Sequence, residues 1–208
     1  MRIRTITVKM LWERCYLLID KNKDAVIIDP GGDAEKILKV LDEEQVKLKA
    51  ILITHGHFDH IGAVEDIKAK TGAEVIAHEE GEKYLREQAY NLSTDFGMDI
   101  SIEADRYVTD KEQLRFNESE LELEVIHVPG HTADSVAYYH RETDSLFSGD
   151  IIFKLGIGRT DFPGSDSSKL AQGIKNRIFS LPDQTTIHPG HGFKTMVEFE
   201  RERNPYIT

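Results

Sequence analysis

The sequence predicts an α/β protein in which two β-sheets pack face to face with helices on the outside. Apolar, strand-like runs alternate with segments of helical periodicity, and this succession occurs twice along the chain. The 208 residues, 39% of them hydrophobic, are enough to bury such a core, and we expect one domain, residues 1–208. No internal repeat or low-complexity tract breaks the pattern.

The first half of the chain begins with three short apolar runs that predict consecutive strands at 2–8, 15–20 and 25–29. Asp33 is placed to cap the helix that follows, which runs to about Glu44. The pattern then predicts a strand at 50–53, a helix at about 60–70, a strand at 74–77 and a helix near 80–88.

The second half opens with residues 90–120, which are polar and weakly periodic apart from a strand-like piece at 106–108. A segment of this length within a compact domain is typically functional or poorly ordered. Regular patterns then return and predict strands at 121–128, 135–139 and 145–147, a helix at about 167–179 and a strand near 185–188.

Composition excludes several classes of partner. The chain has 26 basic and 37 acidic residues, a net charge of −11, and no basic cluster interleaved with aromatics, so we expect no nucleic-acid partner. The N-terminus alternates charged and apolar residues instead of forming a signal peptide, and no apolar run reaches membrane-spanning length. The single cysteine, Cys15, cannot form an internal disulfide and agrees with a cytoplasmic location.

The segment 54–60 holds four potential metal ligands within six residues. His55, His57, Asp59 and His60 directly follow the strand predicted at 50–53, so they lie on the loop at its carboxyl end, where α/β proteins place their chemistry. Imidazole and carboxylate together suit zinc, iron or manganese. Three crowded histidines would repel one another if protonated, which argues against the alternative of a solvated polar loop.

Three further loops bring ligand-type residues to the ends of predicted strands. They contain His131 in Pro-Gly-His-Thr, Asp150 in Ser-Gly-Asp and His191 in Pro-Gly-His-Gly. The glycines let the backbone turn sharply and approach a metal closely. Together the four loops offer five histidines and two aspartates, enough for two metal ions that share one carboxylate.

The order His-x-His-x-Asp-His, Gly-His-Thr, Gly-Asp, Pro-Gly-His-Gly resembles that of metallo-β-lactamase-fold hydrolases, and most closely the short, single-domain glyoxalase II-like (hydroxyacylglutathione hydrolase-like) proteins. The resemblance covers essentially the whole chain. It implies a four-layer αββα sandwich of two mixed sheets flanked by helices. It also implies that the first metal is bound by His55, His57 and His131, the second by Asp59, His60 and His191, and that Asp150 bridges them.

The chemistry implied by this resemblance needs no serine or cysteine nucleophile. Two cations about 3.5–4 Å apart lower the pKa of a bridging water toward 7 and polarise the substrate carbonyl. Asp59 and Asp150 are therefore expected to be catalytic as well as ligands, and Asp59 would be free to act as a general base if only one metal were bound. Zinc is the expected metal, with iron and manganese as alternatives.

Two more residues are assigned by resemblance. Asp29 resembles an acidic residue that orients a ligand histidine, although an ordinary helix-entry turn would explain it too. Arg159 lies in Gly-Arg-Thr-Asp-Phe-Pro-Gly, which resembles a loop at the substrate entrance. It could bind a substrate carboxylate or pair with Asp161. The remaining histidines are expected to be structural: His78, His127, His140 and His188.

The resemblance implies a hydrolase of small acyl thioesters, S-lactoylglutathione among them. Full-length glyoxalase II continues into a helical domain that supplies part of the glutathione site, whereas here sixteen residues follow Gly192. We expect the contact with glutathione to be reduced, or replaced by residues 90–100 and Arg159. The alternatives are a persulfide dioxygenase with a single iron, which the context of His191 disfavours, and a lactonase or phosphodiesterase. A β-lactamase is disfavoured by Asp150, and a non-catalytic module would not need every ligand. The sequence predicts no oligomeric state.

Overall fold

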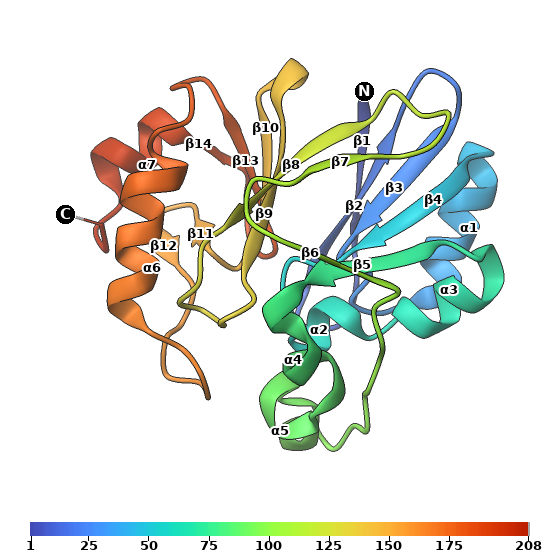
Figure 1. Cartoon of the computed structure of the whole chain (residues 1–208), viewed down its shortest axis with the longest axis horizontal. Helices are drawn as coiled ribbons and strands as arrows, with labels where there is room; N and C mark the ends of the chain where they lie inside the picture. The colour runs from blue at the N-terminus through green and yellow to red at the C-terminus, as the bar shows by residue number, and fades with distance from the viewer. Residues whose placement is uncertain (208) are drawn as a thin grey trace.

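In the computed structural model, which describes residues 1–207, the strands form two mixed six-stranded sheets and one small two-stranded sheet (Figure 1). The first three strands of the first sheet are antiparallel and the rest run parallel. The order of this sheet is β1 (Arg2–Thr7), β2 (Arg14–Ile19), β3 (Asp24–Ile28), β4 (Lys47–Leu52), β5 (Glu74–His78) and β6 (Arg106–Val108).

The second sheet is antiparallel except for the pairing of β10 with β13, which is parallel. Its order is β14 (Thr195–Met196), β13 (Thr186–Pro189), β10 (Ser145–Gly149), β9 (Val136–His140), β8 (Glu122–His127) and β7 (Gln113–Arg115). The small sheet pairs β11 (Ile152–Phe153) with β12 (Gly156–Ile157). Because β8, β10 and β13 run in the same direction, their carboxyl ends meet at one edge.

Helices cover the outer face of each sheet (Figure 1). On the first sheet these are α1 (Ala34–Glu44) and α3 (Val64–Thr71); on the second they are α6 (Ser167–Gly173) and α7 (Val197–Arg203). Three buried apolar clusters fill the spaces between the resulting four layers. The predicted αββα arrangement of two mixed sheets flanked by helices is confirmed.

Strand β2 shows how the sequence divides between the layers. Cys15 and Leu17 point to the cluster beneath the helices, whereas Tyr16 and Leu18 point to the cluster between the sheets. Both faces are buried, so the strand reads as a continuous apolar run without polar alternation. Among the helices of the described residues, none combines the length and the apolar character needed to cross a membrane.

Two helices differ from their prediction. The helix predicted at 60–70 is split into α2 (Phe58–Ile61) and α3, and the break is at Gly62. At the break the backbone N–H of Ala63 donates to the carbonyl of Pro30 at 2.9 Å, and a Cβ at Gly62 would lie 2.4 Å from the carbonyl oxygen of Gly31. The helix predicted at 167–179 ends its α-helical part at Gly173 and continues as a π-helical turn, Ile174–Ile178.

The prediction that the side chain of Asp33 caps α1 is wrong. Asp33 does occupy the N-cap position, but its φ of 49° is left-handed and its side chain makes no hydrogen bond to the helix. The carboxylate accepts instead from the backbone N–H of Lys9 at 2.9 Å. Asp33 therefore ties the β1–β2 connection to the start of α1.

The helix predicted near 80–88 consists of short pieces that continue into the polar segment. A 3-10 turn at Glu79–Gly81 leads to α4 (Glu82–Arg86), and α5 (Gln88–Asn91) and a 3-10 turn at Ser93–Phe96 follow. These pieces lie at the end of the molecule to which β4 and β5 point (Figure 1). The beginning of the polar segment is thus placed beside the histidine loop.

Candidate metal centre

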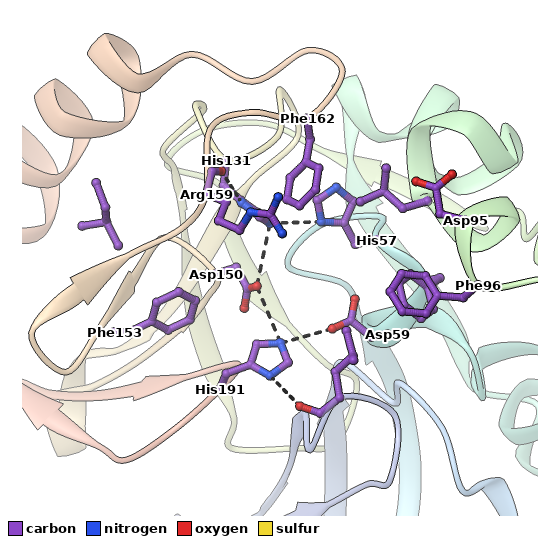
Figure 2. A pocket seen from close by; sticks show the side chains of 14 residues that line it. His57, Asp59, Asp95, Phe96, His131, Asp150, Phe153, Arg159, Phe162 and His191 are labelled. Carbon is purple, nitrogen blue, oxygen red and sulfur yellow. Dashed lines mark hydrogen bonds and ion pairs between the residues drawn. The ribbon is translucent and has the colours of Figure 1, made fainter.

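The seven predicted ligands come together at the carboxyl ends of strands from both sheets. His55, His57, Asp59 and His60 lie on the loop after β4 and in α2. The other three follow strands of the second sheet: His131 after β8, Asp150 after β10 and His191 after β13. Figure 2 shows the side chains from the two sheets pointing toward one another across a pocket.

Three imidazoles form the first cluster. Nδ1 of His57 lies 3.1 Å from Nε2 of His55 and 3.0 Å from Nε2 of His131. Zinc–nitrogen bonds of about 2.0–2.1 Å place two ligands of a tetrahedron roughly 3.3 Å apart, so these nitrogens are within a few tenths of an ångström of the spacing for one metal ion. All three side chains are buried.

Asp59, His60 and His191 form the second cluster. Oδ2 of Asp59 lies 3.2 Å from Nε2 of His191 and 3.8 Å from Nε2 of His60. Nε2 of His60 is buried and has no hydrogen-bond partner. A buried nitrogen without a partner is costly, and coordination to a cation would satisfy it.

Asp150 lies between the two clusters. Its Oδ1 is 3.4 Å from Nε2 of His60, and its Oδ2 is 3.6 Å from Nε2 of His191 and 3.8 Å from Nε2 of His131. Oδ1 is buried without a hydrogen-bond partner. The carboxylate thus reaches ligands of both clusters, as a bridging group must, and the mixed imidazole and carboxylate donors fit two divalent cations.

Three of these five histidines have their outer ring nitrogen held directly by a carboxylate or carbonyl oxygen, whereas Nε2 of His57 is buried without a hydrogen-bond partner. Nδ1 of His60 contacts Oδ2 of Asp29 at 2.9 Å, Nδ1 of His131 contacts the carbonyl of Arg159 at 2.8 Å, and Nδ1 of His191 contacts the carbonyl of Leu11 at 3.2 Å. An N–H that is donated outward leaves the inner nitrogen with its lone pair free for a metal.

Thr54 extends this pattern to His55. Its hydroxyl donates to Oδ2 of Asp29 at 2.6 Å and lies 3.1 Å from Nδ1 of His55. The backbone N–H of Thr54 donates to the other oxygen of Asp29 at 2.7 Å. The structure places Asp29 against His60, as expected of a carboxylate that orients a ligand histidine, and connects it through Thr54 to a second one.

Burial and neighbouring charges set the protonation of the histidines. Burial and the surrounding histidines hold the pKa of His55 well below its ordinary value. The same two causes lower the pKa of His57 to about 3. Burial alone would lower the pKa of His60, but the three carboxylates near it raise that pKa well above 6.5. The first cluster therefore presents neutral imidazoles, as a cation requires.

Glycine is required where the loops meet Asp150. Gly149 has a φ of +47°, and a Cβ there would lie 2.2 Å from the hydroxyl oxygen of Thr54. At Gly190 a Cβ would lie 2.5 Å from Oδ1 of Asp150 and 2.7 Å from a ring carbon of His60. The loops of the two sheets approach each other this closely only because both positions lack side chains.

A cavity of about 470 Å³ opens onto the two clusters. Arg159 lies in its wall, where the guanidinium donates to both oxygens of Asp161 at 3.0 and 2.7 Å and stacks over the ring of Phe162 at 4.4 Å. Of the two interpretations of Arg159 that the sequence left open, the pair with Asp161 is present in the structure, and the role in substrate binding stays a prediction. The cavity is lined by Leu11, His57, Phe58, Asp59, Leu92, Asp95, Phe96, His131, Asp150, Phe153, Ile157, Arg159, Phe162 and His191.

Comparison with known proteins agrees with this site. The family model of the metallo-β-lactamase superfamily matches residues 14–191, which include all seven candidate ligands. The chain belongs to the metallo-β-lactamase superfamily. This confirms the resemblance inferred from the motifs.

Several superfamily members are similar along their whole length. Hydroxyacylglutathione hydrolase GloC of Haemophilus influenzae is 35% identical, with 100% of this chain and 98% of that protein covered. Among solved structures, the BLEG-1 B3 metallo-β-lactamase is 38% identical, with a TM-score of 0.95 and full coverage of both chains. TTHA1623, solved in a di-iron-bound form, is 33% identical, with a TM-score of 0.87 and coverage of 98% and 99%.

Three polar residues near the candidate metal centre were not predicted from the sequence. Thr54 precedes the histidine motif, and Asp134 follows the Gly-His-Thr loop and accepts from the backbone N–H of Gly56 at 3.0 Å. Burial raises the pKa of Asp134 to about 7. Glu13 is fully buried near Asp29, without a hydrogen-bond partner for either oxygen. Proximity to a motif could have indicated the first two, whereas nothing local marks Glu13.

The four histidines expected to be structural lie outside both clusters. His78 stacks on His127 with ring centroids 3.9 Å apart, and His188 stacks on Phe147 at 5.0 Å. His140 accepts from the backbone N–H of Thr143 at a 3-10 turn. None of the four belongs to a group of candidate ligands among the residues that the structure describes.

Proposed function

We propose that this metallo-hydrolase cleaves small acyl thioesters with two divalent metal ions. The position of Asp150 carries the proposal, since its two oxygens face ligands of both clusters. The similarity over the full chain to a hydroxyacylglutathione hydrolase supports thioesters as the substrate class and S-lactoylglutathione as the first candidate.

When bound, two divalent cations supply a hydroxide at neutral pH and polarise the thioester carbonyl. The chain itself holds the ligands in place. Asp29 and the carbonyls of Arg159 and Leu11 fix the ring nitrogens that face away from the site. Asp59 and Asp150 are the carboxylates at the reacting position, and with one metal bound Asp59 is the proposed general base.

Zinc is the proposed metal. A mixed set of histidine and aspartate ligands also accepts iron and manganese, and TTHA1623 is described with two irons. The proposal requires two metal ions per chain, whichever element they are. We place the reaction in the cytoplasm, in keeping with the single buried thiol of Cys15.

Arg159 is the proposed contact for a carboxylate of the thiol carrier. Its side chain is 68% exposed at the wall of the cavity, so a substrate can reach it, and release from Asp161 frees both donors for a bidentate contact. Leu92, Asp95 and Phe96 line the cavity as well. This agrees with the expectation that the 90–100 segment and Arg159 form the substrate site.

Parallel assays on one metal-loaded preparation test the proposal. We expect hydrolysis of S-lactoylglutathione, and no oxygen uptake with glutathione persulfide, which the alternative of a mononuclear iron dioxygenase requires. A β-lactam and a lactone belong in the same set, because the 38% identity to BLEG-1 weakens the argument that Asp150 excludes β-lactams. Oxygen uptake without thioester hydrolysis would overturn the proposal in favour of the dioxygenase.

A further inference from the structure

One wall of the cavity is an aromatic platform directly beside the metal ligands. The rings of Phe58 and Phe96 stack with centroids 4.4 Å apart and an interplanar angle of 31°, and Leu92 lines the same cavity. Phe58 immediately precedes Asp59, so the platform adjoins the second cluster. Phe58 and Leu92 are buried, whereas Phe96 lines the cavity and is 52% exposed, so Phe96 offers the apolar surface that a ligand can cover.

Charge distinguishes this wall from the one that carries Arg159. Figure 2 shows Asp95 and Phe96 to the right of the ligands, and Arg159 and Phe162 above them beside His131 and His57. Within the described chain, Arg159 is the only lysine or arginine that lines the cavity. The carboxylate of Asp95 disfavours an anionic group at the platform, so the carboxylates of a carrier such as glutathione are directed to Arg159.

The thioester has to extend from one wall to the other. Its carbonyl must lie at the metal ligands for hydrolysis, and a carrier held at Arg159 leaves the platform free for the acyl group. We infer, on the basis of the proposed thioester hydrolysis, that the preferred acyl group is an extended apolar one that lies on the exposed ring of Phe96. A lactoyl group is short and carries a hydroxyl, so it would leave most of this apolar surface uncovered.

A series of glutathione thioesters with straight acyl chains from acetyl to hexanoyl tests the inference. Complete burial of one methylene would raise kcat/KM about fourfold. On the half-exposed ring of Phe96 a methylene is only partly buried, so the increase is reduced to about twofold. We therefore expect kcat/KM to rise about two- to fourfold per methylene in the wild type. A flat or falling series would overturn the inference.

Variants of the residues that line the cavity show which side chain causes the dependence of kcat/KM on acyl chain length. Phe96→Ala should flatten the dependence on chain length, whereas Phe96→Leu should retain most of it. Phe153→Ala, on the other side of the cavity, should keep the slope. Tyr206→Ala removes an exposed aromatic ring outside the cavity and controls for general effects on stability. A slope that survives Phe96→Ala, or disappears equally in Phe153→Ala, contradicts the assignment to Phe96.

The two proposals fail in different ways. If no thioester in the series is hydrolysed, the proposed function is wrong and the platform loses its basis. If the thioesters are hydrolysed with no dependence on chain length, thioester hydrolysis stands and only the apolar acyl site is wrong.

Discussion

The side chain of Thr54 connects a buried carboxylate to a proposed metal ligand. Its hydroxyl donates to Asp29 and, with its proton so directed, accepts the N–H of His55. Asp29 also contacts His60 directly. One carboxylate therefore orients a ligand in each cluster, and Thr54 is a positioning residue rather than a ligand.

Two substitutions of Thr54 distinguish the effect of its hydroxyl on metal affinity from the effect of its shape. Thr54→Val keeps the volume and removes the hydrogen bond to His55, so we expect a loss of about 10–100-fold in metal affinity. Thr54→Ser retains the hydroxyl and should stay close to wild type. Competition with a chelator measures the affinities. A loss of affinity in Thr54→Ser with none in Thr54→Val would show that packing of the methyl group, not the hydroxyl, is what matters.

Arg159 provides a second test at the level of single residues. If the guanidinium binds a carrier carboxylate equally in the ground and transition states, Arg159→Ala should raise KM for a glutathione thioester about tenfold with little change in kcat. The increase in KM is not expected to be larger, because Asp161 competes for the guanidinium and the side chain is exposed to solvent. A thioester of a neutral thiol is the control, and an equal loss for both substrates would assign Arg159 to a structural role.

Between elements, the pair of His78 and His127 connects the end of β5 to the end of β8. His78 belongs to the first sheet and His127 to the second, and their rings are stacked. Burial and the nearby His127 lower the pKa of His78 to about 4, although Asp110 opposes this change. Nε2 of His78 is buried without a hydrogen-bond partner. The contact between the sheets is therefore built around a neutral imidazole.

This pair predicts a dependence of stability on pH. In the unfolded chain His78 takes up its proton near 6.5, whereas in the folded protein it does so only near 4. The unfolded state thus binds more protons between these values, and the free energy of unfolding falls as the pH is lowered from 6.5 to 4. One proton contributes at most about 1.4 kcal/mol per pH unit.

Denaturant titrations of wild type and His78→Asn at several pH values measure this contribution. Asparagine has a side-chain oxygen that can accept the Glu80 N–H now bound by Nδ1 of His78, so the turn at the end of β5 is preserved. We expect the difference in unfolding free energy between the two proteins to shrink as the pH falls through the window. If this difference did not change with pH, His78 would be excluded as a source of the pH dependence of stability.

The elements also show what the sequence could and could not predict. The major strands were predictable because both faces of strands such as β2 are buried and their apolar runs are continuous. The break at Gly62 was not, because it accompanies a hydrogen bond from the N–H of Ala63 to the carbonyl of Pro30, which is distant in sequence. The short strands β7, β11, β12 and β14 have two or three residues each, too few for a periodic pattern.

At the scale of the whole molecule, the proposed centre joins the two sheets. The histidine loop is also fastened across the interface by hydrogen bonds: the carbonyl of Ile53 accepts from the Tyr138 hydroxyl at 2.8 Å, and that of Thr54 accepts from the backbone N–H of Val136 at 2.8 Å. The motifs indicated from the sequence the seven residues that come together in this proposed centre. The aromatic platform was not predicted, because its members become neighbours only in the folded chain.

Metal removal should therefore destabilise the fold as well as stop activity. A ligand present at about 100 times its dissociation constant stabilises a folded protein by about 2.7 kcal/mol, and for a chain of this size that corresponds to a change in Tm of roughly 5–10 °C. We expect a decrease of this order on treatment with a chelator, reversed by added metal. An unchanged Tm would mean that the sheets do not depend on the metal for their association.

The most direct test of a binuclear centre is the metal content per chain, measured on wild type, Asp150→Ala and His191→Ala after purification without added metal. Asp150 faces both clusters and His191 belongs to one. We expect two metal ions per wild-type chain, about one in His191→Ala and fewer in Asp150→Ala, since loss of the bridge weakens both sites. One ion per wild-type chain, or equal metal content in the two variants, would contradict the account.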